Sequence, residues 1–287
     1  TWLFVTALAC RLRRTRFVLL LVGAEPVVDP VTRRLHVWTV RLADHVSYRD
    51  VWSFQAMREA GARDPEAIGP DVAFAHPERA VAEPEPGLLV IGVMAYYGRL
   101  DDPVRGAGLR RTYVSALATA LVRLVDQGDR LQLLGGDRVD VEVAQEVAAL
   151  VRAARSDLPV GTVEVLDVRR FDELADRLAR AEVVVVSRFH NLICALKVAR
   201  PVVSIGYARK NTRLMAQLGL TDYCQDIDQL DPERLLEQIA RARQRQQSLT
   251  AGIAERTAGH AAAVRSLLDR VATETLDLSE SGSRVRD

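Results

Sequence analysis

Short apolar runs alternate with amphipathic stretches from residue 88 onward. The run at 88–98 (LLVIGVMAYYG) is followed by residues 113–128, whose apolar side chains recur at helical spacing until Gly128. The alternation continues through apolar runs at 131–136, 162–168, 182–187 and 201–207. Short valine-rich strands that alternate with helices are typical of βαβ units and a parallel sheet. We therefore predict a doubly wound α/β lobe over residues 88–225.

A shorter stretch of the same pattern precedes this lobe. Residues 17–27 (FVLLLVGAEPV) indicate a strand, and residues 46–61 indicate a short strand that turns into a helix ended by Gly61. Between the two regions, RAVAEPEPG combines two prolines, two glutamates and a glycine without periodicity. Such a segment suits an interdomain hinge. We predict a first α/β lobe over residues 1–80 and a hinge over 81–87.

The remaining C-terminal region is predicted to be helical. Asp231 followed by Pro232 is a strong helix start, with a carboxylate cap and a proline in the first turn. Helical patterns cover the RLLEQIARARQRQQ and AAAVRSLLDRVA stretches, and the Arg/Gln tract at 241–247 is interpreted as a solvated helix face. We assign residues 226–287 to C-terminal helices that end in a frayed tail.

Charge and cysteine content exclude several classes of function. Lys plus Arg number 39 against 38 Asp plus Glu, so no global basic field would recruit nucleic acid. The three cysteines are widely spaced and form no CxxC or Cys/His cluster, which argues against a disulfide framework and a metal site. The apolar stretches near the start are shorter than the ~20 residues of a membrane span. We expect a cytoplasmic protein without an integral membrane segment or a metal.

The first residues have the pattern of neither a native N-terminus nor a signal peptide. The chain opens with Thr1, and a basic RLRRTR segment follows the first apolar run instead of preceding it. A signal peptide is therefore a poor interpretation, and we expect a missing N-terminal segment and an incomplete first lobe.

The strongest chemical signal lies where the strand at 183–186 ends. In open parallel sheets ligands bind outside the carboxyl ends of the strands, and Ser187 to Asn191 occupy that position. Backbone N–H groups at a helix start favour an anion, and Arg188 adds a planar fork that matches carboxylate or phosphate. His190 is an imidazole that can hold and deliver a proton near neutral pH.

The next strand end repeats this arrangement. Tyr207, Arg209 and Lys210 follow the run at 201–206, so two neighbouring strand ends would supply several cations and a protonatable ring. Two alternatives stay open: His190 could be a helix cap or a satisfied polar group, and Arg188 could pair with an acid in the same lobe. Tyr96 and Tyr97 could line the same cleft or pack in the core.

Two separated motifs resemble those of the polysaccharide pyruvyl transferases. The stretch SRFHNLICALKVARPVVSIGYARKNTRLMAQLGL resembles the family's C-terminal signature, with Arg188-x-His190, a strand and then Tyr207-x-x-Lys210. An earlier stretch is similar to the family's other signature, which here consists of Ser47, Arg49, Asp50, Ser53, Gly61, Pro70, Asp71 and Phe74. The two motifs keep the family order and are separated by a domain of suitable size, so the resemblance covers most of residues 17–225.

The resemblance implies two Rossmann-like lobes, as in glycosyltransferase-B-like enzymes. It also implies transfer of a pyruvyl group from phosphoenolpyruvate to a sugar diol, giving a pyruvate ketal, with no other cofactor. The expected partners are phosphoenolpyruvate and a glycan or lipid-linked sugar, which could bring the protein to the inner face of the membrane. By the resemblance, His190 and Arg188 are the catalytic residues, with His190 as the acid or as a contact of phosphoenolpyruvate.

The remaining site residues are assigned to substrate binding: Ser187, Asn191, Tyr207, Arg209, Lys210 and, from the first lobe, Arg49. Arg49 has an alternative role, in which it pairs with Asp50 and positions the following helix.

Two other functions remain open. A nucleotide-sugar glycosyltransferase would have similar lobes, but such enzymes commonly place a glutamate on the helix after this strand, where this chain has Cys194. A catalytically inactive binding or scaffold protein could retain the same fold. The acceptor sugar and the oligomeric state are not determined by the sequence.

Overall fold

The computed structural model describes residues 2–77, 82–98 and 103–278. These residues form two compact units, Thr1–Pro77 with Ala258–Asp287 and Glu78–Thr257. The C-terminal region that was predicted as one segment, 226–287, is shared between the two units. Part of the predicted hinge, residue 81, lies outside the described residues.

The first unit contains a small parallel sheet. Its elements are α1 (Trp2–Leu12), β1 (Val18–Val22), α2 (Pro30–Leu42), β2 (His45–Tyr48), α3 (Val51–Glu59), β3 (Ala67–Ile68) and the 3₁₀ turn η1 (Val72–Ala75). The strand order is β1-β2-β3, with Val18 opposite His45 and Ser47 opposite Ala67. The predicted strand at 17–27 and the strand–helix pair at 46–61 are therefore present. Helix α2 was not predicted.

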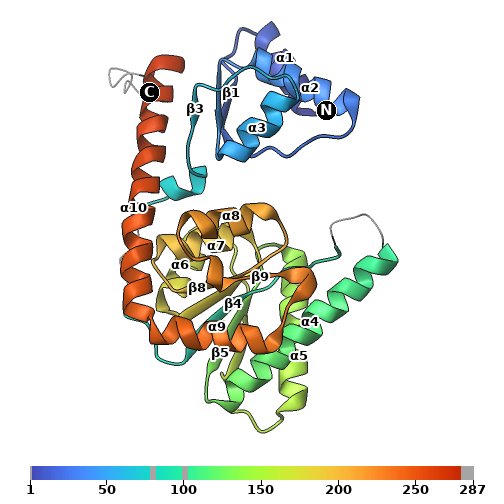
Figure 1. The fold of residues 1–287 in the computed structure, drawn as a ribbon, viewed down its shortest axis with the longest axis vertical. Coiled ribbons are helices and arrows are strands. Elements are labelled where there is room, and N and C mark those ends of the chain that lie inside the picture. The colour runs from blue at the N-terminus through green and yellow to red at the C-terminus, as the bar shows by residue number, and fades with distance from the viewer. Residues whose placement is uncertain (1, 78–81, 99–102, 279–287) are drawn as a thin grey trace, which may run out of the picture. The chain divides into compact units, whose positions relative to one another are not determined.

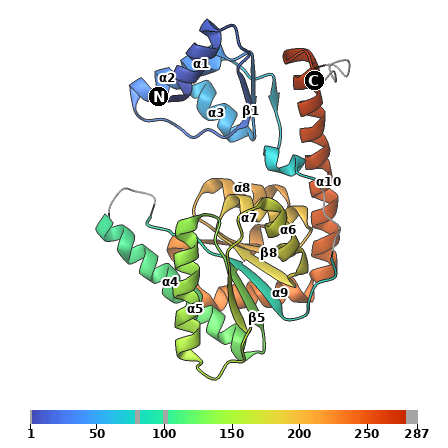
Figure 2. The ribbon, with the colours of Figure 1, turned by 180° about the vertical axis from the view of Figure 1, so that it is seen from behind.

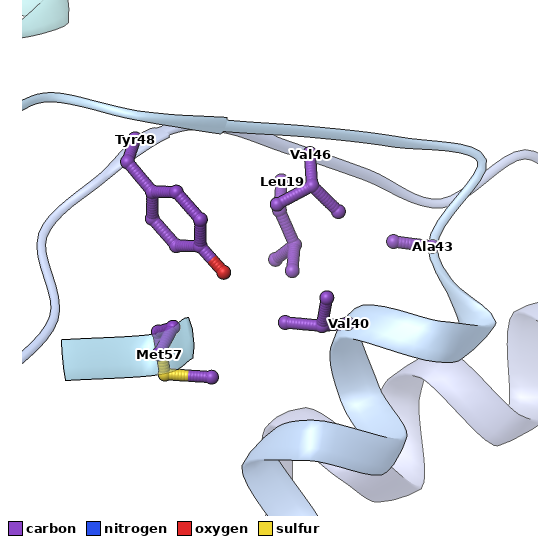
Figure 3. Packing of buried hydrophobic residues seen from close by; sticks show 6 residues of the cluster. All are labelled: Leu19, Val40, Ala43, Val46, Tyr48 and Met57. Atoms are coloured by element: carbon purple, nitrogen blue, oxygen red, sulfur yellow. The ribbon is translucent and has the colours of Figure 1, made fainter. Parts of the chain in front are cut away.

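One face of this sheet carries the core of the first unit. Figure 3 shows Leu19 of β1 and Val46 of β2 packed with Val40 of α2 and with Ala43, which follows α2, while Tyr48 and Met57 complete the cluster. Burying each large apolar side chain contributes roughly 1.5–3 kcal/mol. This cluster therefore fixes β1, β2 and α3 relative to one another.

The second unit is a doubly wound sheet (Figures 1 and 2). Its strands are β4 (Leu88–Gly92), β5 (Arg130–Leu134), β6 (Val163–Leu166), β7 (Val183–Val186), β8 (Val202–Gly206) and β9 (Cys224–Asp226), all parallel in the order β6-β5-β4-β7-β8-β9. Every residue of β4, β7 and β8 is buried, as expected for central strands covered on both faces.

Helices cover both faces of this sheet. Helices α4 (Pro103–Asp126), α5 (Arg138–Ala154) and α9 (Pro232–Gln244) pack together, and α6 (Phe171–Arg180), α7 (Phe189–Lys197) and α8 (Arg209–Gln217) pack in sequence. Short turns η2 (Thr221–Tyr223) and η3 (Ile227–Gln229) flank β9, and α10 (Gln246–Arg270) continues into a π-helical turn at Val271–Thr275.

The observed elements correct several predicted boundaries. The strand predicted at 88–98 ends at Gly92, and the helix predicted at 113–128 begins at Pro103. The C-terminal helix α10 is continuous from Gln246, whereas the sequence pattern indicated only its second half. The tract at 241–247 is not uniformly solvated, because Arg243 pairs with Asp129 and Glu182.

The strand order creates a topological switch point between β4 and β7. The chain leaves β4 toward β5 and β6, then returns to β7 on the other side and continues to β8 and β9. Loops diverge at such a point, and ligands of open α/β sheets bind outside the carboxyl ends of the strands there. The predicted site residues Ser187 to Asn191 follow β7 directly.

Candidate functional site

Arg188 begins helix α7 and is fixed by a buried acid on α5. Its Nε and Nη2 each donate a hydrogen bond of 2.8 Å to Asp140, whose side chain has no exposed surface. This bidentate pair raises the pKa of Arg188 above its usual value. The alternative in which Arg188 pairs with an acid in the same lobe is therefore what the structure shows. The arginine side chain keeps 30% of its surface exposed.

The Arg188–Asp140 pair depends on a glycine turn after β5. A Cβ on Gly136 would lie 2.9 Å from Arg188 Cγ, and a Cβ on Gly135 would lie 2.7 Å from the Cβ of Asp140. Real Cβ atoms do not approach other atoms so closely. The GlyGly sequence at 135–136 therefore provides the space through which Arg188 reaches the carboxylate.

Ser187 and Asn191 are buried beneath the loop rather than exposed on it. The Ser187 hydroxyl is 3.2 Å from Tyr113 Oη, and its carbonyl accepts from Asn211 Nδ2 at 3.3 Å. Burial raises the pKa of Tyr113 to about 12, so this phenol stays protonated. The solvent exposure of Ser187 is 1% and that of Asn191 is 3%. The bonds of Ser187 hold the loop after β7, whereas Asn191 Nδ2 is buried without a hydrogen-bond partner among the described residues. Direct contact of either residue with a ligand remains a prediction.

His190 is exposed in the first turn of α7. Its ring lies edge-on to that of Phe189, with centroids 5.9 Å apart. Phe189 itself is buried and contacts the Lys210 ammonium, which lies 5.1 Å from the ring centroid. The imidazole is thus free of the buried hydrogen-bond network around Arg188 and open to solvent.

The cations after β8 lie in two different places. Lys210 lies over the rings of both Phe189 and Tyr207, at 5.1 and 5.3 Å, on the side of α7. Arg209 instead lines an open pocket of about 470 Å³ toward β9, together with Arg234, Asp226 and Thr212. The structure therefore associates Lys210 and Tyr207 with the α7 start and places Arg209 beside a separate polar groove.

The N-cap and first-turn positions of α7 and α8 contain no acidic residue. The N-cap positions, Arg188 and Ala208, make no side-chain cap hydrogen bond, and neither first turn contains an acid. By contrast, carboxylates cap α2, α3, α5 and α9. Uncapped amides and the helix dipole attract anions. Anion binding at these two neighbouring helix starts remains a prediction.

Arg49 has acidic partners within the first unit. Its Nη1 is 3.1 Å from Asp71 and its Nε is 3.7 Å from Asp50, whose carboxylate caps α3 by accepting from Ser53 N. The guanidinium also occupies the space that a side chain on Gly23 would need. The alternative structural role of Arg49 is therefore present, and ligand binding by Arg49 remains a prediction.

Other residues of the earlier motif have local structural roles. Ser53 accepts a hydrogen bond from Ala24 N after β1, and Ser47 accepts one from Leu21 N. Phe74 is buried. The motif thus stabilises the β1 loop and the start of α3.

Sequence reasoning did not identify Asp140 or Tyr113. Asp140 lies 48 residues before Arg188, and only the sheet order brings them together. A weak signal was available, because Gly135, Gly136 and an acid follow a buried strand at a predicted carboxyl edge. Tyr96 is buried and donates to Asp228 at 2.7 Å, whereas Tyr97 is 55% exposed.

Within the described residues no group of three or more His, Cys, Asp or Glu side chains has the arrangement of a metal site. A membrane-spanning helix is likewise not found in that part of the chain. Cys10, Cys194 and Cys224 are all free thiols.

Solved structures with similar folds belong to sugar-nucleotide and sugar-phosphate enzymes. A Neisseria meningitidis UDP-GlcNAc 2-epimerase, solved with UDP-GlcNAc, aligns with a TM-score of 0.59 and 9% identity over 94% of this chain and 73% of its own. A Burkholderia multivorans trehalose 6-phosphate synthase aligns with a TM-score of 0.51 and 16% identity over 96% and 69%. The class defined is an α/β protein with two Rossmann-like lobes of the glycosyltransferase-B-like type.

The family is given by the sequence itself. The family model of the polysaccharide pyruvyl transferases matches residues 2–209, and the chain belongs to this enzyme family. The match includes the earlier motif and the Arg188-x-His190 part of the later one, and it ends one residue before Lys210. No curated protein matches the chain in sequence.

Proposed function

We propose that this protein transfers a pyruvyl group from phosphoenolpyruvate to a sugar diol of a cell-surface polysaccharide or its precursor. The observation that carries the proposal is the pair of uncapped, acid-free helix starts of α7 and α8, accompanied by Arg188 and Lys210. Phosphoenolpyruvate has a carboxylate and a phosphate, and two adjacent positive helix ends with cations suit both groups.

The transfer chemistry assigns His190 the role of acid. His190 donates a proton to the methylene carbon of phosphoenolpyruvate, which develops positive charge at the adjacent carbon. One sugar hydroxyl adds there, and the carbon–oxygen bond to phosphate breaks. The second hydroxyl then closes the ketal. Of the two hydroxyl protons, one restores His190 and one leaves with phosphate, so the reaction balances.

The setting is part of the same proposal. Three free thiols suit a reducing cytoplasm, and a lipid-linked acceptor would bring the protein to the inner face of the membrane. The nucleotide-sugar alternative has weaker support, because Cys194 is fully buried and offers no acid to a ribose. Burial raises the pKa of that thiol to about 12.

The test is an incubation of the protein with phosphoenolpyruvate and a panel of glycans and lipid-linked sugars. Released phosphate and the mass of each glycan are measured, with UDP-sugars as alternative donors. The proposal predicts phosphate release matched by a glycan that gains one ketal-linked pyruvate. Glycosyl transfer from a UDP-sugar without pyruvyl transfer would favour the nucleotide-sugar function instead.

A further inference from the structure

One buried carboxylate connects the ends of three adjacent strands. Asp140 accepts hydrogen bonds from Ala95 N after β4 at 2.7 Å, from Gly136 N after β5 at 3.0 Å, and from two nitrogens of Arg188 after β7. Strands β5, β4 and β7 are neighbours in the sheet. Asp140 therefore lies beneath the switch point and joins its three loops.

Asp140 occupies one edge of the Arg188 guanidinium and leaves one terminal nitrogen, Nη1. Nε and Nη2 of Arg188 are both used by Asp140. Nη1 has no hydrogen-bond partner among the described residues, and it is not one of their buried unpaired atoms. A fork held along one edge loses little rotamer freedom when its remaining nitrogen binds an anion.

We propose that Asp140 is a positioning residue for anion binding at this site. It fixes Arg188 through the Nε–Nη2 edge, so that Nη1 and the amides at the start of α7 together receive one anionic group. The identity of that anion as phosphoenolpyruvate rests on the proposed function. The positioning role itself applies to any anion of this chemistry, including inorganic phosphate.

The chain provides a matched control at the opposite edge of the same sheet. Asp129 precedes β5, is 5% exposed, and accepts from Arg243 Nη2 at 2.6 Å. It is thus a buried carboxylate in an arginine pair of the same unit, located at the amino ends of the strands. Substitution of Asp129 measures the structural cost of losing such a pair.

The experiment titrates phosphoenolpyruvate and inorganic phosphate separately by calorimetry. The variants are Asp140→Asn, Arg188→Met, their double mutant and Asp129→Asn. We expect Asp140→Asn to raise the dissociation constants of both anions by ~10-fold or more, as for residues that orient a ligand-binding side chain. In the Arg188→Met background the same change should add less than about twofold, because coupled residues are not additive. Asp129→Asn should lower the melting temperature and leave both dissociation constants unchanged.

A second perturbation covers the case in which Asp140→Asn does not fold. Gly136→Ala would displace Arg188 while leaving the carboxylate in place, since its Cβ would lie 2.9 Å from Arg188 Cγ. Gly136→Ala should also weaken the binding of both anions.

Three results would overturn the inference. Asp140→Asn could lower anion affinity equally in the wild-type and Arg188→Met backgrounds, Asp129→Asn could lower it as much as Asp140→Asn, or the wild type could bind neither anion. Binding of inorganic phosphate but not phosphoenolpyruvate would refute the proposed function, while the phosphate titrations still decide the role of Asp140.

Discussion

His190 is an exposed residue between buried ones. Phe189 before it and Asn191 after it are both buried, while the imidazole is open to solvent at the carboxyl edge of the sheet. A structural cap would be expected to use its ring nitrogens in the local network, and the loop after β7 is instead held by Tyr113 and Asn211. The position therefore suits a group that acts on a ligand.

Replacing His190 by alanine should abolish phosphate release from phosphoenolpyruvate in the presence of the acceptor. Because the side chain is exposed, the melting temperature should change little, in keeping with surface substitutions within about 0.5 kcal/mol. Phosphate release and thermal unfolding are measured on the same preparation, with the half-buried His36→Ala as a control. Turnover like that of the wild type would exclude the acid role.

Arg188→Lys should weaken binding of phosphoenolpyruvate. A lysine ammonium is a point charge and cannot both replace the bidentate bond to Asp140 and present a fixed donor to the ligand. Titration calorimetry gives the dissociation constant, which we expect to rise about tenfold, or about 1.4 kcal/mol. An unchanged constant would remove Arg188 from the site.

At the scale of elements, the two uncapped helix starts are the main feature. A helix gains ~0.5–2 kcal/mol from a carboxylate or hydroxyl cap, and α7 and α8 forgo this contribution. Helix α6 also lacks a side-chain cap, but Asp172 and Glu173 lie in its first turn. Among the helices whose caps are described, only those that begin after β7 and β8 have no acidic residue at the N-cap or in the first turn.

Substituting Ala208 by aspartate should stabilise the protein and impair donor binding. Ala208 has extended backbone angles, as a capping residue requires, so the new carboxylate should add about 1 kcal/mol of stability. The same charge would repel an anion at the start of α8. Thermal unfolding and phosphoenolpyruvate titration are the readouts.

Arg170→Asp is the matched control for Ala208→Asp, because it places the same cap on α6. It should leave the dissociation constant for phosphoenolpyruvate unaltered. If Ala208→Asp binds the donor as tightly as the wild type, the helix start of α8 takes no part in the site.

A second element-scale prediction concerns η1 and the part of α10 that belongs to the first unit. His260 is half-buried with its ring centroid 4.9 Å from that of Phe74, and burial lowers its pKa below 6.5. The unfolded chain then binds more protons than the folded one as the solution becomes acidic. Stability should therefore be full above about pH 6.5 and fall as pH drops toward the lowered pKa.

Thermal unfolding between pH 5 and 8 measures this effect. His260→Gln should show a smaller loss of melting temperature on acidification than the wild type. Some loss should remain, because burial also lowers the pKa of His45. Identical pH profiles for the two proteins would exclude His260 as a source of the acid sensitivity.

The sequence predicted an element well where the element's own residues show its burial or its end. Four consecutive buried valines identify β7, and Gly61, with φ of 93°, ends the predicted helix region. Strand β9 (Cys224–Asp226) has no apolar run and forms because it pairs with β8, which local pattern cannot reveal. The first half of α10 was missed because it has few apolar positions, so its local pattern does not indicate a helix.

The site was predicted in part. Strand ends and cations are visible in sequence, because parallel strands place their carboxyl ends at one edge. Two features depend on sheet order and side-chain direction, neither of which the local sequence shows. They are the ion pair between Arg188 and Asp140 and the separation of Arg209 from Lys210.

At the scale of the whole molecule, two units and one family signature define the protein. The family match spans both units, from residue 2 to residue 209, and includes His190 and Arg188 of the second unit and Arg49 of the first. Structures similar at 9–16% identity share the fold alone. The donor is therefore a proposal that rests on the site, on its two helix starts and on the Arg188 side chain bonded to Asp140.

Titration of phosphoenolpyruvate and UDP-GlcNAc into the wild type and Arg188→Met tests this choice most directly. We predict that phosphoenolpyruvate binds the wild type, that the variant binds it at least about tenfold more weakly, and that UDP-GlcNAc does not compete. Tight binding of UDP-GlcNAc with no binding of phosphoenolpyruvate would contradict the account.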